Sequence, residues 1–157
     1  MSSRSSFAAI DDLPRELNRS REPDALAAAE GQRALSPRVL VVEDDTVISH
    51  LIDHLLTRSG FAVDVAPDGR RAQELMETLT PPSLVILDVM LPFVGGFELI
   101  ERLRAKPLWA KIPILMLTSK SHQDYVVRAF GAGVDDYVTK PFRPEELIAR
   151  VRRLAGV

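Results

Sequence analysis

Hydrophobic positions in the second part of the chain alternate between two spacings. Consecutive or alternating apolar residues, typical of strands buried in a sheet, occupy 39–42, 61–66, 83–88, 112–118 and 135–140. Between them, apolar residues recur as on one face of a helix, in 47–56, 68–79, 96–105, 123–133 and 144–157. This alternation predicts an α/β doubly wound fold, in which a five-stranded parallel sheet is covered by five helices.

The first 36 residues follow neither pattern. They are rich in Ser, Arg, Glu and Ala and contain few large apolar side chains, so they bury too little surface to offset the entropy lost on ordering. The stretch 23–35 suits a short helix, because Pro and Asp favour a helix start and Ala favours its body. We therefore expect a flexible extension over 1–36 and a folded domain over 37–157.

Composition narrows the class of protein. A hydrophobic fraction of 46% and a charged fraction of 27% are ordinary for a globular domain, and the net charge of −2 gives no general reason to bind nucleic acid or an anionic membrane. The absence of cysteine excludes disulfides and thiolate metal sites. No apolar run approaches the length of a membrane span, and the N-terminus lacks the apolar core of a signal peptide. We expect a cytoplasmic protein without membrane contact.

Polar residues stand where four of the predicted strands end. The third strand lies in "LVILDVMLP" (84–92), where Asp88 interrupts an apolar run. Ligands and chemistry in this fold class gather beyond the carboxyl ends of the strands. The residues that the strands bring to this edge are Glu43, Asp44 and Asp45, then Asp88, then Thr118 and Ser119, and finally Lys140.

The charges of these residues indicate which ligands the sheet edge can bind. Clustered carboxylates repel one another strongly at close range and need a cation. Oxygen ligands without His or Cys suit Mg²⁺, which keeps several waters and accepts phosphate oxygens as ligands. Lys140 adds a positive charge and Thr118 a hydroxyl donor, so the group is suited to hold a phosphoryl group. Asp88 is then the nucleophile that accepts it.

These motifs together resemble the receiver domain of two-component response regulators. The resemblance rests on "VLVVEDD", "LVILDVMLP", the Gly pair 95–96, "ILMLTS" and "DDYVTKPF", and covers about residues 38 to 155. It implies a flavodoxin-like receiver fold with Asp88 as the phosphoacceptor. It also implies that Glu43, Asp44, Asp88 and the backbone carbonyl of Met90 hold Mg²⁺. A sensor histidine kinase or phosphotransfer protein would supply the phosphoryl group.

The same resemblance assigns the remaining site residues. Lys140 and Thr118 would contact the phosphoryl group, and Thr118 with Tyr137 would form the switch that responds to it. The bond between Lys140 and Pro141 is expected to be cis, a form that prolyl bonds adopt at modest cost. Such a domain is a signalling module and not an enzyme, apart from catalysing its own phosphorylation and dephosphorylation.

The last third is most similar to regulators that dimerise through the fourth helix, fifth strand and fifth helix of the receiver. Asp136 and Arg150 would form a pair between two copies, whereas Val126 replaces the usual Lys opposite Glu146 and removes another pair. We expect a homodimer on phosphorylation, or a different downstream protein partner, at this face. Because the sequence ends after the fifth helix, no winged-helix domain and no direct DNA binding are expected.

Two other functions compete with a phosphorylated receiver. One is a receiver-fold interaction module that works without phosphate, although such modules usually lose some of the site residues kept here. The other is a Mg²⁺-dependent phosphatase, which would want an Asp where this chain has Met90. Met90 and Lys120 also occupy the positions best placed to orient water for dephosphorylation, and neither is suited to it, so we expect slow phosphate loss. His50 and His54 are expected to be exposed.

Overall fold

The computed structural model describes residues 22–119 and 123–157. Its contacts divide the chain into two compact units, Met1–Leu35 and Ser36–Val157. In the first unit, the described residues form one helix, α1 (Glu22–Leu35), which includes the stretch that the sequence favours as helical. Low average hydrophobicity and exposed Leu26 are consistent with a helix that buries little apolar surface.

The second unit is built on one parallel sheet with strand order β2-β1-β3-β4-β5, the order typical of flavodoxin-like folds. The predicted fold class is confirmed, with five helices in this unit and α1 as a sixth helix outside it. Strand bounds are β1 (Arg38–Val42), β2 (Ala62–Ala66), β3 (Leu84–Asp88), β4 (Ile114–Thr118) and β5 (Asp136–Thr139). The helices are α2 (Thr46–Arg58), α3 (Gly69–Thr78), α4 (Gly96–Ala105), α5 (Gln123–Gly131) and α6 (Pro144–Ala155).

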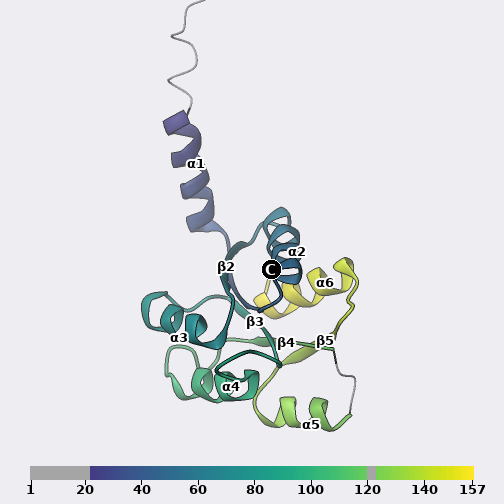
Figure 1. The fold of residues 1–157 in the computed structure, drawn as a ribbon. Helices are drawn as coiled ribbons and strands as arrows, with labels where there is room; N and C mark the ends of the chain where they lie inside the picture. The colour runs from purple at the N-terminus through teal and green to yellow at the C-terminus, as the bar shows by residue number, and fades with distance from the viewer. Residues whose placement is uncertain (1–21, 120–122) are drawn as a thin grey trace, which may run out of the picture. The chain divides into compact units, whose positions relative to one another are not determined.

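Helices cover both faces of the sheet, as Figure 1 shows: α2 and α6 lie on one face, and α3, α4 and α5 on the other. Alternate residues along each strand supply the two cores, because successive side chains point to opposite faces. Leu84 and Ile86 of β3 pack toward α2 and α6, whereas Val85 and Leu87 pack toward the other three helices. Every residue of β3 and β4 is buried, which explains their continuous apolar runs.

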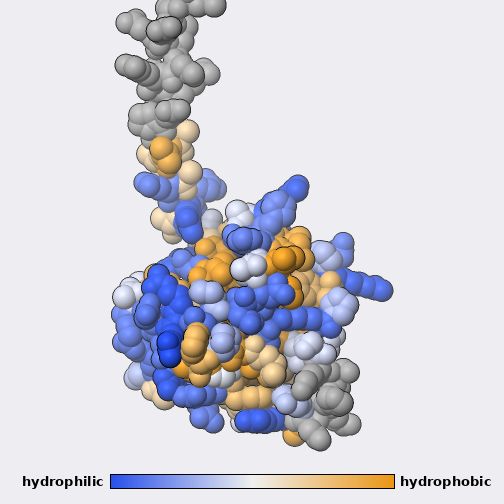
Figure 2. Space-filling model, in the orientation of Figure 1, coloured by the Kyte–Doolittle hydropathy of each residue, from blue (hydrophilic) through white to orange (hydrophobic). Residues whose placement is uncertain are grey.

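Aspartate side chains cap the N-termini of two of these helices. Asp45 caps α2, because its Oδ1 accepts hydrogen bonds from the backbone N–H of Val47 and Ile48 at 2.9 and 3.1 Å. Asp68 caps α3 in the same way through Arg71 N–H. Figure 2 shows that polar side chains dominate the visible surface of the second unit, with smaller apolar areas between them. The polar residues that follow β1 and β2 are therefore held in place by hydrogen bonds to the first turns of α2 and α3.

Candidate functional site

The register of the sheet brings the predicted site residues to one edge. Val42 pairs with Leu87, so Glu43 follows β1 at the level of Asp88. Asp88 in turn pairs with Leu117, one residue before Thr118. Thr118 pairs with Thr139, one residue before Lys140. Glu43, Asp88, Thr118 and Lys140 therefore come from the ends of four different strands, and the parallel pairing places them at the same edge of the sheet.

Three carboxylates converge at this edge. One oxygen from each of Glu43, Asp44 and Asp88 lies within 4.8 Å of the others. Glu43 is 1% exposed and Asp88 is 6% exposed, whereas Asp44 is exposed to solvent. Glu43 Oε1 accepts a hydrogen bond from the Asp45 N–H at 3.0 Å, which holds the buried carboxylate in place. Asp45, the third acid of the sequence motif, is used as a helix cap and is not a member of this cluster.

Lys140 is the cation that contacts the two buried acids. Its Nζ donates to Asp88 Oδ2 at 2.6 Å and lies 2.8 Å from Glu43 Oε2. The Lys140 N–H donates to the Thr118 carbonyl at 2.7 Å, and the Lys140–Pro141 bond is cis as expected. Burial alone would lower the pKa of Lys140, but the contacts with Asp88 and Glu43 outweigh it and the pKa is raised. Lys140 therefore stays positively charged at neutral pH.

Glu43 experiences the opposite balance. Burial raises the pKa of this carboxyl, and the nearby charge of Asp88 raises it further. The contacts with Lys140 and the Asp45 N–H lower it, but only in part. The net shift shows that the buried negative charge is not fully compensated by the protein groups around it. A further cation would supply the missing compensation.

The loop after β3 holds Asp88 from the other side. The Met90 N–H donates to Asp88 Oδ1 at 2.8 Å, so both carboxylate oxygens have a donor. Gly96 begins α4 directly against this loop, since a Cβ there would lie 2.7 Å from the Asp88 carbonyl oxygen and from Val89 Cα. Only glycine allows this approach, which explains the Gly at this position of the motif. The Met90 side chain itself is 57% exposed.

The donor set fits Mg²⁺ better than other common metals. Among the described residues at this edge, the ligands on offer are carboxylate oxygens, with one exposed carboxylate that leaves room for bound water. Mg²⁺ prefers oxygen ligands and retains several waters. Three carboxylates against one ammonium also leave an excess of negative charge. The site can therefore attract a divalent cation and, next to it, a phosphoryl group.

Comparison with known proteins identifies the family. The family model that describes the response regulator receiver domain matches residues 39–152 of this sequence. This chain belongs to the receiver domain family of response regulators. The regulator RpaA of Synechocystis is 45% identical over 118 residues, which cover 75% of this chain and 48% of that protein. The phosphate regulon regulator PhoB of Rhizobium meliloti is 44% identical, over 75% of this chain and 52% of its own length.

Solved receiver structures share the fold. The chemotaxis regulator CheY4 of Vibrio cholerae is 30% identical with a TM-score of 0.72, over 76% of this chain and 98% of that one. A receiver domain of a Pseudomonas aeruginosa sensor histidine kinase is 29% identical with a TM-score of 0.71, over 78% of this chain and 99% of its own. The latter structure has a magnesium ion coordinated in its active site cleft.

The chain spans about half the length of the curated relatives that it matches. RpaA is described as a DNA-binding transcriptional regulator and PhoB as a transcriptional regulatory protein. The expectation that this protein does not bind DNA rested on where the sequence ends, and these relatives give it no support. Among the described residues, no helix is both long and apolar enough to cross a membrane.

The residues of the expected partner face contact one another within the chain. Arg150 Nη1 lies 2.7 Å from Asp136 Oδ2 of the same chain, and Arg150 also contacts Glu146 at 2.9 Å. The predicted pair of Asp136 and Arg150 is formed within this chain, and its formation between two copies stays a prediction. Arg153, which the sequence did not single out, makes a second contact to Asp136. Val126 is half-buried, and the apolar surface of α5 comes from its more exposed neighbours, Val127 and Phe130.

The other predicted residues divide into three groups. Tyr137 is half-buried on β5, with its ring edge-on to Phe130 at 6.1 Å between centroids. His50 and His54 are exposed, as expected. Lys120 lies outside the described residues, so its predicted place in the site stays a prediction.

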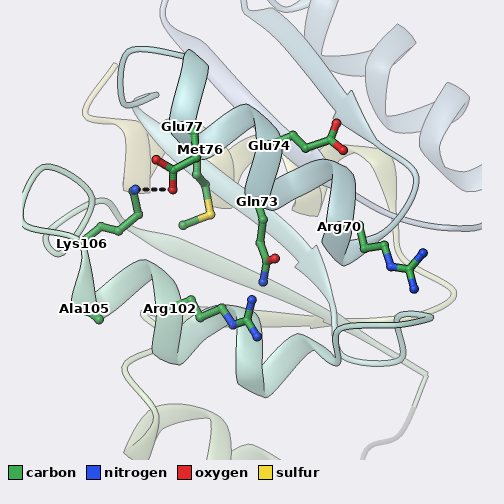
Figure 3. Close-up of a pocket in the computed structure, with 8 residues that line it drawn as sticks. All are labelled: Arg70, Gln73, Glu74, Met76, Glu77, Arg102, Ala105 and Lys106. Atoms are coloured by element: carbon green, nitrogen blue, oxygen red, sulfur yellow. Dashed lines mark hydrogen bonds and ion pairs between the residues drawn. The ribbon is translucent and has the colours of Figure 1, made fainter.

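A separate groove of about 640 Å³ lies between α3 and α4. Figure 3 shows its walls, where Lys106 of the α4 side reaches Glu77 of α3 at 2.7 Å and the Gln73 side chain points toward Arg102. None of the three clustered acids lines it. Its cations are largely committed to neighbouring acids, since Arg102 pairs with Glu98 and Lys106 with Glu77. The chemistry predicted from the sequence therefore lies at the sheet edge and not in this groove.

Proposed function

We propose that the receiver accepts a phosphoryl group on Asp88 from a sensor histidine kinase or a phosphotransfer protein, with Mg²⁺ bound by Glu43, Asp44, Asp88 and the Met90 carbonyl. The observation that carries this proposal is the position of the Asp88 carboxylate, within 4.8 Å of two further acids and 2.6 Å from Lys140. Mg²⁺ would neutralise charge on the phosphoryl oxygens during transfer. A cytoplasmic location and a receiver over residues 37–157 belong to the same proposal.

Asp88 is oriented for attack by its two donors. The Met90 N–H donates a hydrogen bond to one carboxylate oxygen and Lys140 donates to the other. The Asp88 side chain is therefore already oriented before the phosphorylated partner protein binds. An Asp88 oxygen forms the new bond to phosphorus while the bond from phosphorus to the donor imidazole nitrogen breaks, and that nitrogen keeps the electron pair. Lys140 then compensates charge on the transferred group, and the buried Thr118 supplies a hydroxyl donor to it.

The switch that follows involves Thr118 and Tyr137. Thr118 is 2% exposed at the end of β4, and Tyr137 packs on the neighbouring strand against the core. A shift of Thr118 toward the phosphoryl group would open space that the Tyr137 ring can fill by turning inward. The surface formed by α5, β5 and α6 would then change its affinity for a downstream protein or a second copy. Sedimentation with and without beryllofluoride tests for the homodimer, and one mass in both states contradicts it.

The proposal is tested by intact mass after incubation with Mg²⁺ and acetyl phosphate. The wild-type protein should gain one phosphate, and Asp88→Asn should gain none. Asp53→Asn is the matched control, because it makes the same chemical change on α2, where Asp53 accepts a hydrogen bond from Thr57. Equal labelling of the Asp88→Asn variant would rule out Asp88 as the acceptor.

We also propose that the phosphorylated state is long-lived. Hydrolysis needs a water in line with the phosphorus, and Met90 offers that water no strong hydrogen bond. The double variant Met90→Asn, Lys120→Glu should lose phosphate about 10-fold faster, which corresponds to a barrier lowered by about 1.4 kcal/mol. Phosphate loss is followed by intact mass after acetyl phosphate is removed. An unchanged rate would show that water positioning does not limit hydrolysis.

A further inference from the structure

The loop between β3 and α4 contains an aromatic residue in an unusual conformation. Phe93 has a φ of 68°, in the left-handed region that bulky side chains rarely adopt. Phe93 is 68% exposed, so burial in the core does not explain why it is held there. The guanidinium carbon of Arg70 lies 4.0 Å from the centre of the ring, within the range of a cation–π contact. Phe93 is thus fixed by a residue from α3.

A second contact joins the same two elements. A Cβ at Gly69, the first residue of α3, would lie 2.6 Å from both the Cβ and the carbonyl oxygen of Val94. The Val94 N–H donates to the Pro92 carbonyl at 2.9 Å, so the loop turns tightly at this point. The middle of the loop therefore rests on the first turn of α3, with Arg70 stacked on the neighbouring residue.

The ends of the loop are tied to the proposed metal site. The Met90 N–H donates to Asp88 Oδ1 at 2.8 Å, and the Gly96 N–H donates to the Val89 carbonyl at 3.1 Å. The segment from Met90 to Gly95 is anchored at both ends, and its middle is held through Phe93 and Val94. The direction of the Met90 carbonyl therefore depends on where the middle of this short segment is held.

We propose that Arg70 and Phe93 form a latch, meaning the stacked pair itself, that positions the Met90 backbone for Mg²⁺. This inference rests on the proposed function, in which the Met90 carbonyl is a metal ligand. Arg70 and Phe93 are positioning residues, because neither belongs to the acidic cluster. Opening the latch frees the loop to sample other conformations, so Mg²⁺ binding must then include the cost of ordering it.

The direction in which Mg²⁺ affinity changes on replacing Arg70 distinguishes the positioning role from a purely electrostatic one. Arg70 is positively charged, so its loss would strengthen Mg²⁺ binding if only long-range charge mattered. Loss of the latch would weaken binding instead. In Figure 3 the Arg70 side chain extends away from Arg102 and Lys106 on the other wall of the groove. Arg71, the next residue, pairs with Glu74 on the exposed side of α3 and offers the same charge without the stacking.

The experiment measures Mg²⁺ affinity by titration calorimetry on the full chain. The variants are Arg70→Gln, Phe93→Leu and the double variant, with Arg71→Gln as the control for charge and Phe93→Tyr as the conservative replacement that keeps the ring. An exposed cation–π contact corresponds to about a 2- to 5-fold change in an equilibrium constant. We expect each latch variant to weaken Mg²⁺ binding by about that factor, and the double variant to be no weaker than the singles. Phe93→Tyr should bind like wild type.

Thermal unfolding without Mg²⁺ serves as the second readout, and the latch variants should unfold within about 4 °C of wild type, the shift that loss of one exposed contact produces. Two outcomes would overturn the latch. One is that Arg70→Gln binds Mg²⁺ with the same affinity as Arg71→Gln. The other is that the double variant loses as much Mg²⁺ binding free energy as the two single variants together. Wild-type protein that neither binds Mg²⁺ nor becomes phosphorylated would instead overturn the proposed function. The two failures are therefore distinguishable.

Discussion

Two aspartates in this receiver are almost equally buried but lie in opposite electrostatic settings. Asp88, at the end of β3, is 6% exposed, and Asp136, at the start of β5, is 7% exposed. Asp88 shares one lysine with Glu43 and lies near Asp44, so three acids face one cation. Asp136 contacts both Arg150 and Arg153. With Glu146 on Arg150, two acids face two cations there.

The difference shows how a binding site can be told from a structural ion cluster. Around Asp136 the charges cancel, and hydrogen bonding to Asp136 raises the pKa of Arg150 because it favours the charged form. Around Asp88 the charges do not cancel, and burial raises the pKa of Glu43 because it disfavours the charged form. A charge-balanced cluster is costly to break, because removing one member leaves an uncompensated charge. A cluster that stays out of balance is suited to bind a cation.

Removing the cation from the Asp88 cluster gives the largest expected effect. Lys140→Met leaves the buried acids without their ammonium partner, and we expect the free energy of unfolding to fall by about 3 kcal/mol without Mg²⁺. Saturating Mg²⁺ should restore much of this loss, because binding to the folded state alone stabilises it. Urea denaturation with and without Mg²⁺ measures both values. Lys106→Met, which removes an exposed pair with Glu77, should cost less than about 0.5 kcal/mol.

Removing the central acid from the balanced cluster should give a smaller loss that no metal restores. Asp136→Ala leaves Arg150 and Arg153 without their shared partner and the Tyr137 N–H without its acceptor. Both arginines are partly exposed, so water compensates in part, and we expect a loss of about 2 kcal/mol. Glu146→Ala, at an exposed pair, is the matched control. Recovery of Asp136→Ala on adding Mg²⁺ would contradict the distinction between the two clusters.

The acidic edge could be predicted from sequence because it depends on topology alone. Parallel strands place Glu43, Asp88 and Lys140 at the same edge of the sheet. The contact itself also needs the long side chain of Lys140, which reaches across from β5. Asp45 stands beside Glu43 and Asp44 in the sequence, and its position directly before a helical pattern is a recognisable N-cap signal. The fold class needed no more than the spacing of apolar residues.

Contacts that depend on side-chain direction could not be predicted. Arg104 donates to the carbonyls of Gly133, Ala110 and Ile112 and joins loops that are distant in sequence. Nothing in the spacing of Arg104 distinguishes it from an exposed helical arginine. The contacts of Asp136 with Arg150 and Arg153 could not be predicted for the same reason. Side-chain rotamers decide whether such residues pair within one chain or with another copy. Propensity and periodicity carry no information about those rotamers.

The smallest expected effect concerns the pH dependence of the unbalanced cluster. Because burial raises the pKa of Glu43, the folded state holds this proton over a range that begins above the ordinary value of 4.5. The unfolded state has already lost it there, so stability without Mg²⁺ decreases as pH rises through this range. Glu43→Gln keeps the acceptor for the Asp45 N–H but never ionises. The variant should therefore be more stable than wild type at neutral pH.

The same titration predicts how metal binding responds to pH. Mg²⁺ requires the ionised carboxylate, so a proton on Glu43 competes with the metal, and the apparent Mg²⁺ affinity of wild type should rise as pH increases through this range. Glu43→Gln should bind Mg²⁺ more weakly and with less dependence on pH. Glu74→Gln, an exposed carboxylate lost from α3, is the control for net charge. Calorimetric titrations at several pH values above 4.5 measure both slopes. If the wild-type and Glu43→Gln slopes coincide, Glu43 does not carry the uncompensated charge that sets the Asp88 cluster apart from the Asp136 cluster.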